Sequence, residues 1–175
     1  SNVSLVAKAL QVKSKEYSFS YITKKDTLEV KSLADWRKML TFFVFKPYQM
    51  ARAEIILLDN IFLPFAYLRR RKGTKVVQLW HGTGTIKKFG QDVNTGKLKE
   101  LEKRANANIT HLIVNSPAMK ELYAGAFGVR TSFVYPIGLP KTDELLKRIY
   151  RVQKENRNID KEKIYQKYHI PNQMK

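Results

Sequence analysis

The sequence has no cysteine among its 175 residues. This absence excludes a disulfide scaffold, a thiolate zinc site, a cysteine nucleophile and a thiol redox switch. No apolar run approaches the ~18 residues that a membrane-spanning helix needs, and the first residues show no basic-then-apolar signal pattern. Since 43% of the residues are hydrophobic, as in ordinary globular proteins, we expect a folded protein that is soluble or membrane-peripheral.

Acidic residues are also scarce. Only 15 Asp and Glu stand against 33 Lys and Arg, which gives a formal net charge of +18. Such an excess favours a polyanionic partner, which could be nucleic acid, an anionic membrane face or a phosphate-rich substrate. The sequence also lacks a Walker A loop, a Gly-x-Gly-x-x-Gly fingerprint, a Gly-x-Ser-x-Gly elbow, the ligand spacing of a metal site and a recognised nucleic-acid motif.

The chain alternates between short apolar runs and helical patterns. Continuous apolar character is typical of strands that are covered on both faces. The strand-like segments are residues 17–22, 54–59, 75–80, 110–115 and 131–135. The segments with helical patterns are residues 4–12, 36–50, 62–71 and 97–107, together with a helix capped by Ser116 that stops near Gly125. This alternation predicts an α/β fold with a Rossmann-like, doubly wound parallel sheet.

The two ends of the chain suggest how it divides into domains. Residues 1–143 are predicted to form one Rossmann-like domain. A doubly wound domain normally begins with a strand, whereas this chain begins with a helical pattern, so we expect a first strand to be missing. Residues 144–175 are predicted to be a helical linker toward a second domain that this chain lacks.

The most informative junction follows the strand-like segment that ends in Trp80. In open α/β sheets, ligands bind beyond the carboxyl ends of the strands. His81 stands at such an end, and an imidazole can take a proton from an attacking hydroxyl near neutral pH. Gly82 in the following loop allows backbone N–H groups to approach an anion, and Lys87 and Lys88 add cationic donors. A lone histidine in such a turn more often only hydrogen-bonds the backbone, and the spacing leaves that interpretation open. His111 and His169 stand where packing or solvation is expected instead.

Two segments are candidates for membrane contact. Arg69, Arg70, Arg71 and Lys72 form a basic run, and residues 36–46, which begin with Trp36, mix basic and aromatic side chains. Both compositions suit an anionic membrane interface. Taken alone, the basic run fits a solvated helix end slightly better, since cations there complement the helix dipole. The aromatic side chains fit equally a place in the core.

Residues 78–90, QLWHGTGTIKKFG, resemble the histidine signature of the CDP-glycerol glycerophosphotransferases, which prime and polymerise wall teichoic acid. The small-residue loop before Lys-Lys-Phe-Gly is more similar to the primase branch than to the polymerases. Residues 57–60, 114–117 and 138–143 resemble further family blocks in the same order. Lys141 departs from the usual arginine, which keeps the charge but loses the bidentate geometry toward phosphate.

The resemblance implies the N-terminal, acceptor-side half of a GT-B-type fold built from two Rossmann-like domains. It implies transfer of glycerol phosphate from CDP-glycerol to an acceptor hydroxyl with release of CMP, and His81 matches the family's candidate general base. The residues implied in substrate binding are Asn60, Gly82, Thr83, Lys87, Lys88, Ser116 and Asp143.

The resemblance also implies the partners. CDP-glycerol would be bound mainly by the missing domain, so we expect the isolated chain to be inactive and to hold neither a cofactor nor a metal. The expected partners are a lipid-diphosphate-linked saccharide and an anionic membrane surface at the cytoplasmic face of the bacterial cell membrane, without nucleic acid. The alternative is a non-catalytic basic α/β module that binds nucleic acid or an anionic membrane.

Overall fold

The computed structural model describes residues 1–23, 44–68, 70–82, 84, 87–154 and 159–169. They form two compact units, Ser1–Leu139 and Pro140–Lys175. The elements of the first unit are α1 (Asn2–Lys13), β1 (Ile55–Leu58), η2 (Leu63–Ala66), β2 (Lys75–Gln78), η3 (Gly90–Asp92), α3 (Gly96–Asn106), β3 (His111–Ile113), η4 (Pro117–Met119), α4 (Lys120–Phe127), η5 (Thr131–Phe133) and β4 (Val134–Tyr135), where η denotes a 3-10 helix. Residues 44–52 are also helical.

Four parallel strands form the sheet in the order β1-β2-β3-β4. Each strand lies inside one of the predicted apolar segments, and the predicted Rossmann-like parallel α/β sheet is confirmed. Ile56 pairs with Val76, Gln78 with Leu112, and Leu112 with Val134. Because paired residues of neighbouring strands point to the same face, these side chains all share one face of the sheet.

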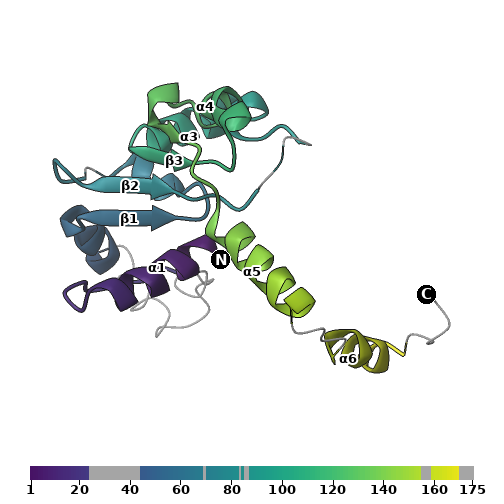
Figure 1. The fold of residues 1–175 in the computed structure, drawn as a ribbon. Helices are drawn as coiled ribbons and strands as arrows, with labels where there is room; N and C mark the ends of the chain where they lie inside the picture. The colour runs from purple at the N-terminus through teal and green to yellow at the C-terminus, as the bar shows by residue number, and fades with distance from the viewer. Residues whose placement is uncertain (24–43, 69, 83, 85–86, 155–158, 170–175) are drawn as a thin grey trace, which may run out of the picture. The chain divides into compact units, whose positions relative to one another are not determined.

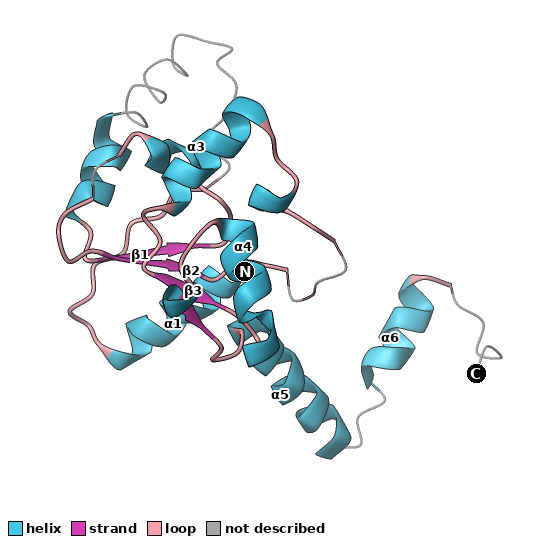
Figure 2. Cartoon of the chain, turned by 90° about the horizontal axis from the view of Figure 1, so that it is seen from above, coloured by secondary structure: helices cyan, strands magenta, loops and turns pink. Residues whose placement is uncertain are grey.

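Helices cover both faces of this sheet (Figure 1). On the face that holds Val76, η2 contributes Phe65 and α3 contributes Ala105 to one buried cluster. On the opposite face, Val3 and Val6 of α1 pack against a cluster of Leu79, Ile113 and Leu139. Seen from above, the strands run side by side, with α3 on one side of them and α1 on the other (Figure 2).

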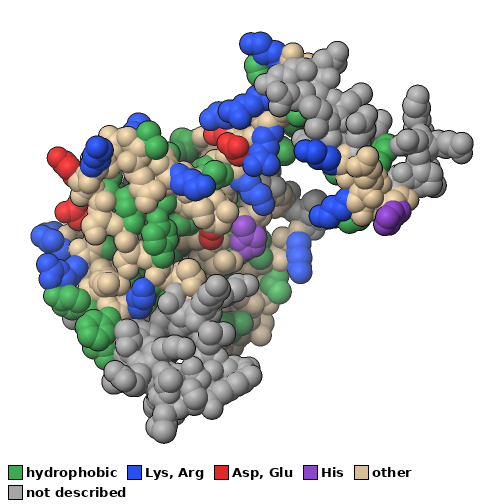
Figure 3. All heavy atoms as spheres, turned by 90° about the horizontal axis from the view of Figure 1, so that it is seen from below, with side chains coloured by type: hydrophobic (Ala, Val, Ile, Leu, Met, Phe, Trp, Pro, Cys, Tyr) green, Lys and Arg blue, Asp and Glu red, His purple; other side chains and the backbone are tan. Residues whose placement is uncertain are grey.

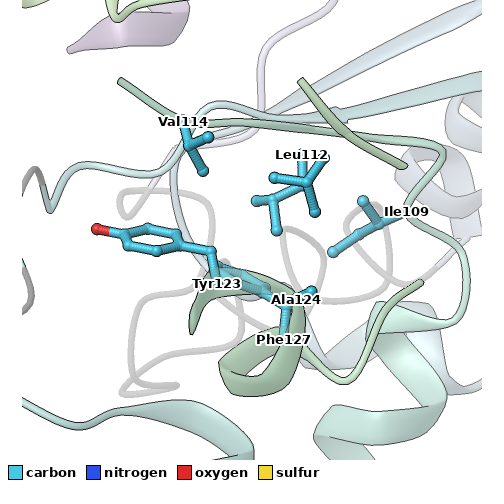
Figure 4. Close-up of a cluster of buried hydrophobic side chains, with 7 residues drawn as sticks. Ile109, Leu112, Val114, Tyr123, Ala124 and Phe127 are labelled. Atoms are coloured by element: carbon cyan, nitrogen blue, oxygen red, sulfur yellow. The ribbon is translucent and has the colours of Figure 1, made fainter. Parts of the chain in front are cut away.

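A third buried cluster fixes α4 against β3 (Figure 4). Leu112 of β3 and Phe127 of α4 have no exposed surface at all. Burial of side chains of this size stabilises the fold by about 1.5–3 kcal/mol each. Tyr123 belongs to the same cluster, and its phenol oxygen points away from the other side chains. This packing places Tyr123 where its hydroxyl reaches the loop that follows β2.

Three predicted elements differ from the structure. The described residues of 62–71 form no α-helix, and the four residues of η2, which contain Pro64, form a 3-10 turn instead. Residues 17–22 form no strand. Ser116 takes the predicted N-cap position before Pro117, but it caps the 3-10 turn η4 rather than an α-helix and makes no side-chain capping bond, and α4 begins only at Lys120. Helix α4 runs to Phe127 and is capped by Gly128 (φ +65°), rather than stopping near Gly125. Of the predicted helix 36–50, the part before residue 44 lies outside the described residues.

The second unit contains α5 (Pro140–Lys154) and α6 (Ile159–Lys167), as the helical pattern predicted. The apolar side chains of α5, from Leu145 to Val152, are largely exposed. Within the described ranges, no helix is both long and apolar enough to cross a membrane. The role of this unit as a linker stays a prediction.

Candidate functional site

His81 lies where the carboxyl ends of β1 and β2 meet. Its Nδ1 atom is 3.1 Å from the main-chain oxygen of Asp59, which follows β1. A carbonyl oxygen can only accept a hydrogen bond, so this contact requires the proton on Nδ1. Neutral His81 then has its free lone pair on Nε2, and the exposed ring can accept a proton there.

Trp80 forms the wall beside this histidine. Its φ angle of +51° is unusual for a bulky residue and turns the chain sharply away from the strand direction. The indole ring is stacked on Phe89 at 5.1 Å and meets Phe127 edge-on at 5.2 Å. The His81 ring lies 4.2 Å from it. The aromatic packing therefore fixes the indole ring, and with it the apolar side of the site.

A cavity of about 360 Å³ opens beside His81. Its lining residues are Trp80, His81, Gly82, Gly84, Lys87 and Phe89. A Cβ atom on Gly82 would lie 2.9 Å from Nε1 of Trp80, so a larger residue there would displace the indole. The cavity combines a proton acceptor, an exposed cation at Lys87 and an aromatic wall.

Tyr123 holds the loop that forms this cavity. Its hydroxyl donates to the main-chain oxygens of Gly82 at 3.0 Å and of Gly84 at 3.3 Å. Burial raises the pKa of the Tyr123 phenol, so the hydroxyl stays a donor over a wide pH range. The sequence placed Asp59 in a strand-end junction without giving it a role, and it did not single out Tyr123, because that side chain reaches the site from a distant helix.

The remaining predicted substrate residues are only partly brought together. Asn60 directly follows Asp59 and is exposed, and Lys88 is exposed but does not line the cavity. Ser116 is half-buried just beyond β3. Asp143 belongs to α5 in the second unit. Three of the predicted residues, Thr83, Arg69 and Trp36, lie outside the described residues.

The basic run lies at the other edge of the sheet. Arg71 and Lys72 line a second cavity of about 370 Å³ together with Lys75, the first residue of β2. Arg70 donates to the main-chain oxygen of Thr74 at 3.2 Å and is held against the turn. Since the strands are parallel, this cavity at their amino ends is far from the His81 edge. Basic side chains recur on the face seen from below (Figure 3).

His111 has a separate environment. As predicted, it is the first residue of β3, at the end opposite to the cavity. Its ring stacks on Tyr135 at 4.9 Å. Partial burial, and then the nearby charge of Lys75, lower the pKa of His111 below its ordinary value. Across the described ranges, no three metal-binding side chains come together.

The model of one protein family, described as CDP-glycerol:poly(glycerophosphate) glycerophosphotransferase, matches residues 1–172. The chain belongs to this family. The glycerophosphotransferase family model thus takes in both units of the chain, including His81 and the loop that follows it.

Relatives within the glycerophosphotransferase family agree with this assignment. The chain is 33% identical over 122 residues to a teichoic acid glycerol-phosphate primase of Bacillus subtilis, covering 67% of this chain and 32% of the relative. It is 32% identical over 103 residues to a teichoic acid ribitol-phosphate primase of Bacillus spizizenii, covering 55% and 26%. It is 34% identical over 110 residues to the ribitol-phosphate polymerase TarL of Staphylococcus aureus, covering 61% and 19%.

The chain therefore spans a third or less of the length of these relatives. Among solved structures, it is similar to the wall teichoic acid polymerase TagF carrying the H548A substitution. That similarity has a TM-score of 0.49 at 22% identity, over 69% of this chain and 29% of the other. The family, with primases and polymerases of teichoic acid among its members, supports a transferase role for this chain.

Proposed function

We propose that this chain is the acceptor-side half of a GT-B-type glycerophosphotransferase that extends a lipid-linked teichoic acid precursor with glycerol phosphate from CDP-glycerol. The observation that carries the proposal is the position of His81. Its Nδ1 donates to the Asp59 carbonyl, so its Nε2 can act as the base, and His81 lines a cavity of about 360 Å³. The match to glycerol- and ribitol-phosphate transferases supports the reaction class.

In the proposed reaction, Nε2 of His81 takes the proton of the acceptor hydroxyl. The hydroxyl oxygen then attacks the phosphorus that bears glycerol, and a new oxygen–phosphorus bond forms. The bond between that phosphorus and the bridging oxygen of the diphosphate breaks, and CMP leaves with the electron pair. General base catalysis of this kind contributes about 10²–10⁴-fold to the rate.

Lys87 is the proposed electrostatic partner of this step. It lines the same cavity as His81 and is exposed, so its ammonium group can reach phosphate oxygens there. Lys88, Asn60 and the glycine-containing loop would complete the acceptor surface. An ammonium group placed where negative charge develops stabilises the transition state more than the ground state.

The basic turn from Arg70 to Lys75 is the proposed contact with anionic lipid. Arg71, Lys72 and Lys75 gather around one cavity at the amino ends of β1 and β2. Basic residues close to an anionic leaflet contribute about 1 kcal/mol each. A few such residues are sufficient for peripheral attachment to an anionic membrane.

The donor site is proposed to lie mainly in chain that the longer relatives have beyond the part matched here. The 175-residue chain alone should then neither bind CDP-glycerol tightly nor release CMP. Tight binding of CDP-glycerol by this chain in calorimetry would contradict a donor site that lies mainly outside it.

The base assignment is tested by His81→Gln in the full-length protein, with CMP release as the readout. Turnover should fall by about 10²–10⁴-fold, while the affinity for CDP-glycerol stays within a few-fold of the original. The matched control is His111→Gln, which changes a histidine at the other end of the sheet and should leave turnover intact. Normal turnover in His81→Gln would refute the role of His81.

The membrane contact is tested by flotation with vesicles that contain anionic lipid, using the double variant Arg71→Gln/Lys72→Gln. At about 1 kcal/mol per charge, affinity should fall by roughly 30-fold at low salt. The control removes two exposed charges elsewhere, by Lys97→Gln/Lys99→Gln on α3. Equal losses in the two double variants would refute a specific role for the basic turn.

A further inference from the structure

Gln78 is the last residue of β2 and has no exposed surface. Its side chain lies on the apolar face of the sheet, where a hydrophobic residue of the same size would be expected. A buried amide is costly unless both of its ends are hydrogen-bonded. The presence of Gln78 therefore points to specific partners.

Both ends of the Gln78 amide bind main-chain groups beyond the ends of the strands. Its Nε2 donates to the main-chain oxygen of Asn60 at 3.1 Å, and its Oε1 accepts from the main-chain N–H of Trp80 at 3.1 Å. The bond from Leu79 N–H to the oxygen of Leu58, at 2.8 Å, is the preceding rung between the two strands. The backbone pairing of β1 and β2 ends with this bond, and the side chain of Gln78 links the two segments beyond it.

The two groups that Gln78 binds are direct neighbours of the His81 contact. Trp80, with its φ of +51°, immediately precedes His81, and Asn60 immediately follows Asp59. The Asp59 oxygen is the group that holds Nδ1 of His81. One buried side chain therefore fixes both the segment that carries the imidazole and the segment that carries its acceptor.

We propose that Gln78 is a positioning residue that sets the tautomer of His81 and keeps Nε2 free as the base. Without it, the Asn60 carbonyl and the Trp80 N–H lose their partner, and the two segments are held together only from α1, by Asn2 on the Trp80 oxygen and by the Val3 N–H on the Asp59 carboxylate. The imidazole then relaxes toward the tautomer with the proton on Nε2, which free histidine prefers and which cannot accept a proton at that atom. The relevance of this tautomer for catalysis rests on the proposed function, whereas the tautomer itself does not.

The tautomer is measured by long-range ¹H–¹⁵N correlation spectra of the ¹⁵N-labelled 175-residue chain at a pH where the imidazoles are neutral. The His81 signals are assigned by their loss in His81→Gln. The wild-type chain should show protonated Nδ1 and unprotonated Nε2. Gln78→Met keeps the size of the side chain and removes both bonds. In this variant, the ratio of the Nδ1-protonated to the Nε2-protonated tautomer of His81 should fall by about five- to tenfold, which corresponds to the loss of one hydrogen bond.

Asn106→Leu is the matched control, because Asn106 is another buried amide whose Nδ2 donates to the main-chain oxygen of Phe127 at 2.9 Å. It should destabilise the chain without changing the His81 signals. An unchanged ratio in Gln78→Met, or an equal change in Asn106→Leu, would overturn the proposal.

A second measurement needs no variant. In the wild-type chain, the side-chain NH₂ of Gln78 should exchange slowly with solvent and show a through-bond coupling to the Asn60 carbonyl. Fast exchange without that coupling would also overturn the proposal, even if Gln78→Met does not fold. If the tautomer depends on Gln78 while CMP release does not depend on His81, the positioning role stands and the base assignment falls.

Discussion

The bond network of Tyr123 gives a sharp prediction, because Tyr123→Phe removes a single hydroxyl. The ring should keep its edge contact with Phe89 at 5.4 Å and its place beside Phe127. Only the bonds to the main-chain oxygens of Gly82 and Gly84 are lost. We expect the loop beside His81 to loosen, with a small cost in global stability.

The expected cost follows from the bonds themselves. One hydroxyl proton is shared between two carbonyl oxygens, so the loss is that of one hydrogen bond, about 0.5–1.5 kcal/mol. Gly84 is exposed, and its carbonyl can bind water once the phenol is gone, which favours the lower part of that range. At the urea sensitivity typical of small proteins, the midpoint of unfolding should fall by roughly half a molar.

The effect should also change with pH. Burial raises the pKa of Tyr123, so the folded chain keeps this proton when the unfolded chain loses it near pH ~10. The unfolded state then binds fewer protons, and wild-type stability falls as the pH rises further. Tyr123→Phe has no such group, so the stability gap between variant and wild type should narrow above pH ~10.

Urea unfolding at neutral and alkaline pH, together with amide hydrogen exchange of the loop, measures both effects. Tyr135→Phe is the control, because Tyr135 is 37% exposed and lies on β4, away from the loop. It should leave exchange at Gly82 and Gly84 unchanged. The reasoning fails if Tyr123→Phe leaves the loop as protected as before, or if its stability gap does not depend on pH.

Two further predictions concern stability. Gly90→Ala should destabilise the chain by about 1–3 kcal/mol more than Gly96→Ala. Both glycines have positive φ, +60° and +56°, but a Cβ on Gly90 would clash with the Ala126 oxygen, whereas Gly96 has open space. Equal urea midpoints for the two variants would contradict this packing. The lowered pKa of His111, caused by burial and then by Lys75, means that the unfolded chain takes up this proton first as pH falls. Stability should therefore decrease below pH ~6.5, and His111→Phe should reduce that decrease in acid-range urea titrations; an unchanged slope would argue against it.

The sheet was predictable because its strands carry their own signal. The run from Ile55 to Leu58 is continuously apolar, and the structure makes it a strand between two covered faces. The segment 62–71 misled because its apolar spacing fits a helix, yet its described residues form only the 3-10 turn Leu63–Ala66. Gly125 and Gly128 are both plausible helix ends in sequence, and only the left-handed φ of Gly128 decides between them.

The site was predictable only in part, for a related reason. His81 and Lys87 stand in one local motif, and the structure brings them to one cavity. The groups that orient the motif come from elsewhere in the chain. Asp59 reaches it from the residue after β1 and Tyr123 from α4, with sequence separations of 22 and 39 to 41 residues. No local pattern encodes such contacts.

The kink at Trp80 links the site to the helix at the start of the chain. A bulky residue at positive φ is strained by about 1–3 kcal/mol, and it persists only where its surroundings hold it. Gln78 holds its N–H, and the side chain of Asn2 in α1, 3% exposed, donates to its oxygen at 2.6 Å. Asn2 is 78 residues away in sequence. Helix α1 therefore does more than cover one face of the sheet, because loss of this helix would release one of the two bonds that keep the Trp80 peptide, and hence His81, in place.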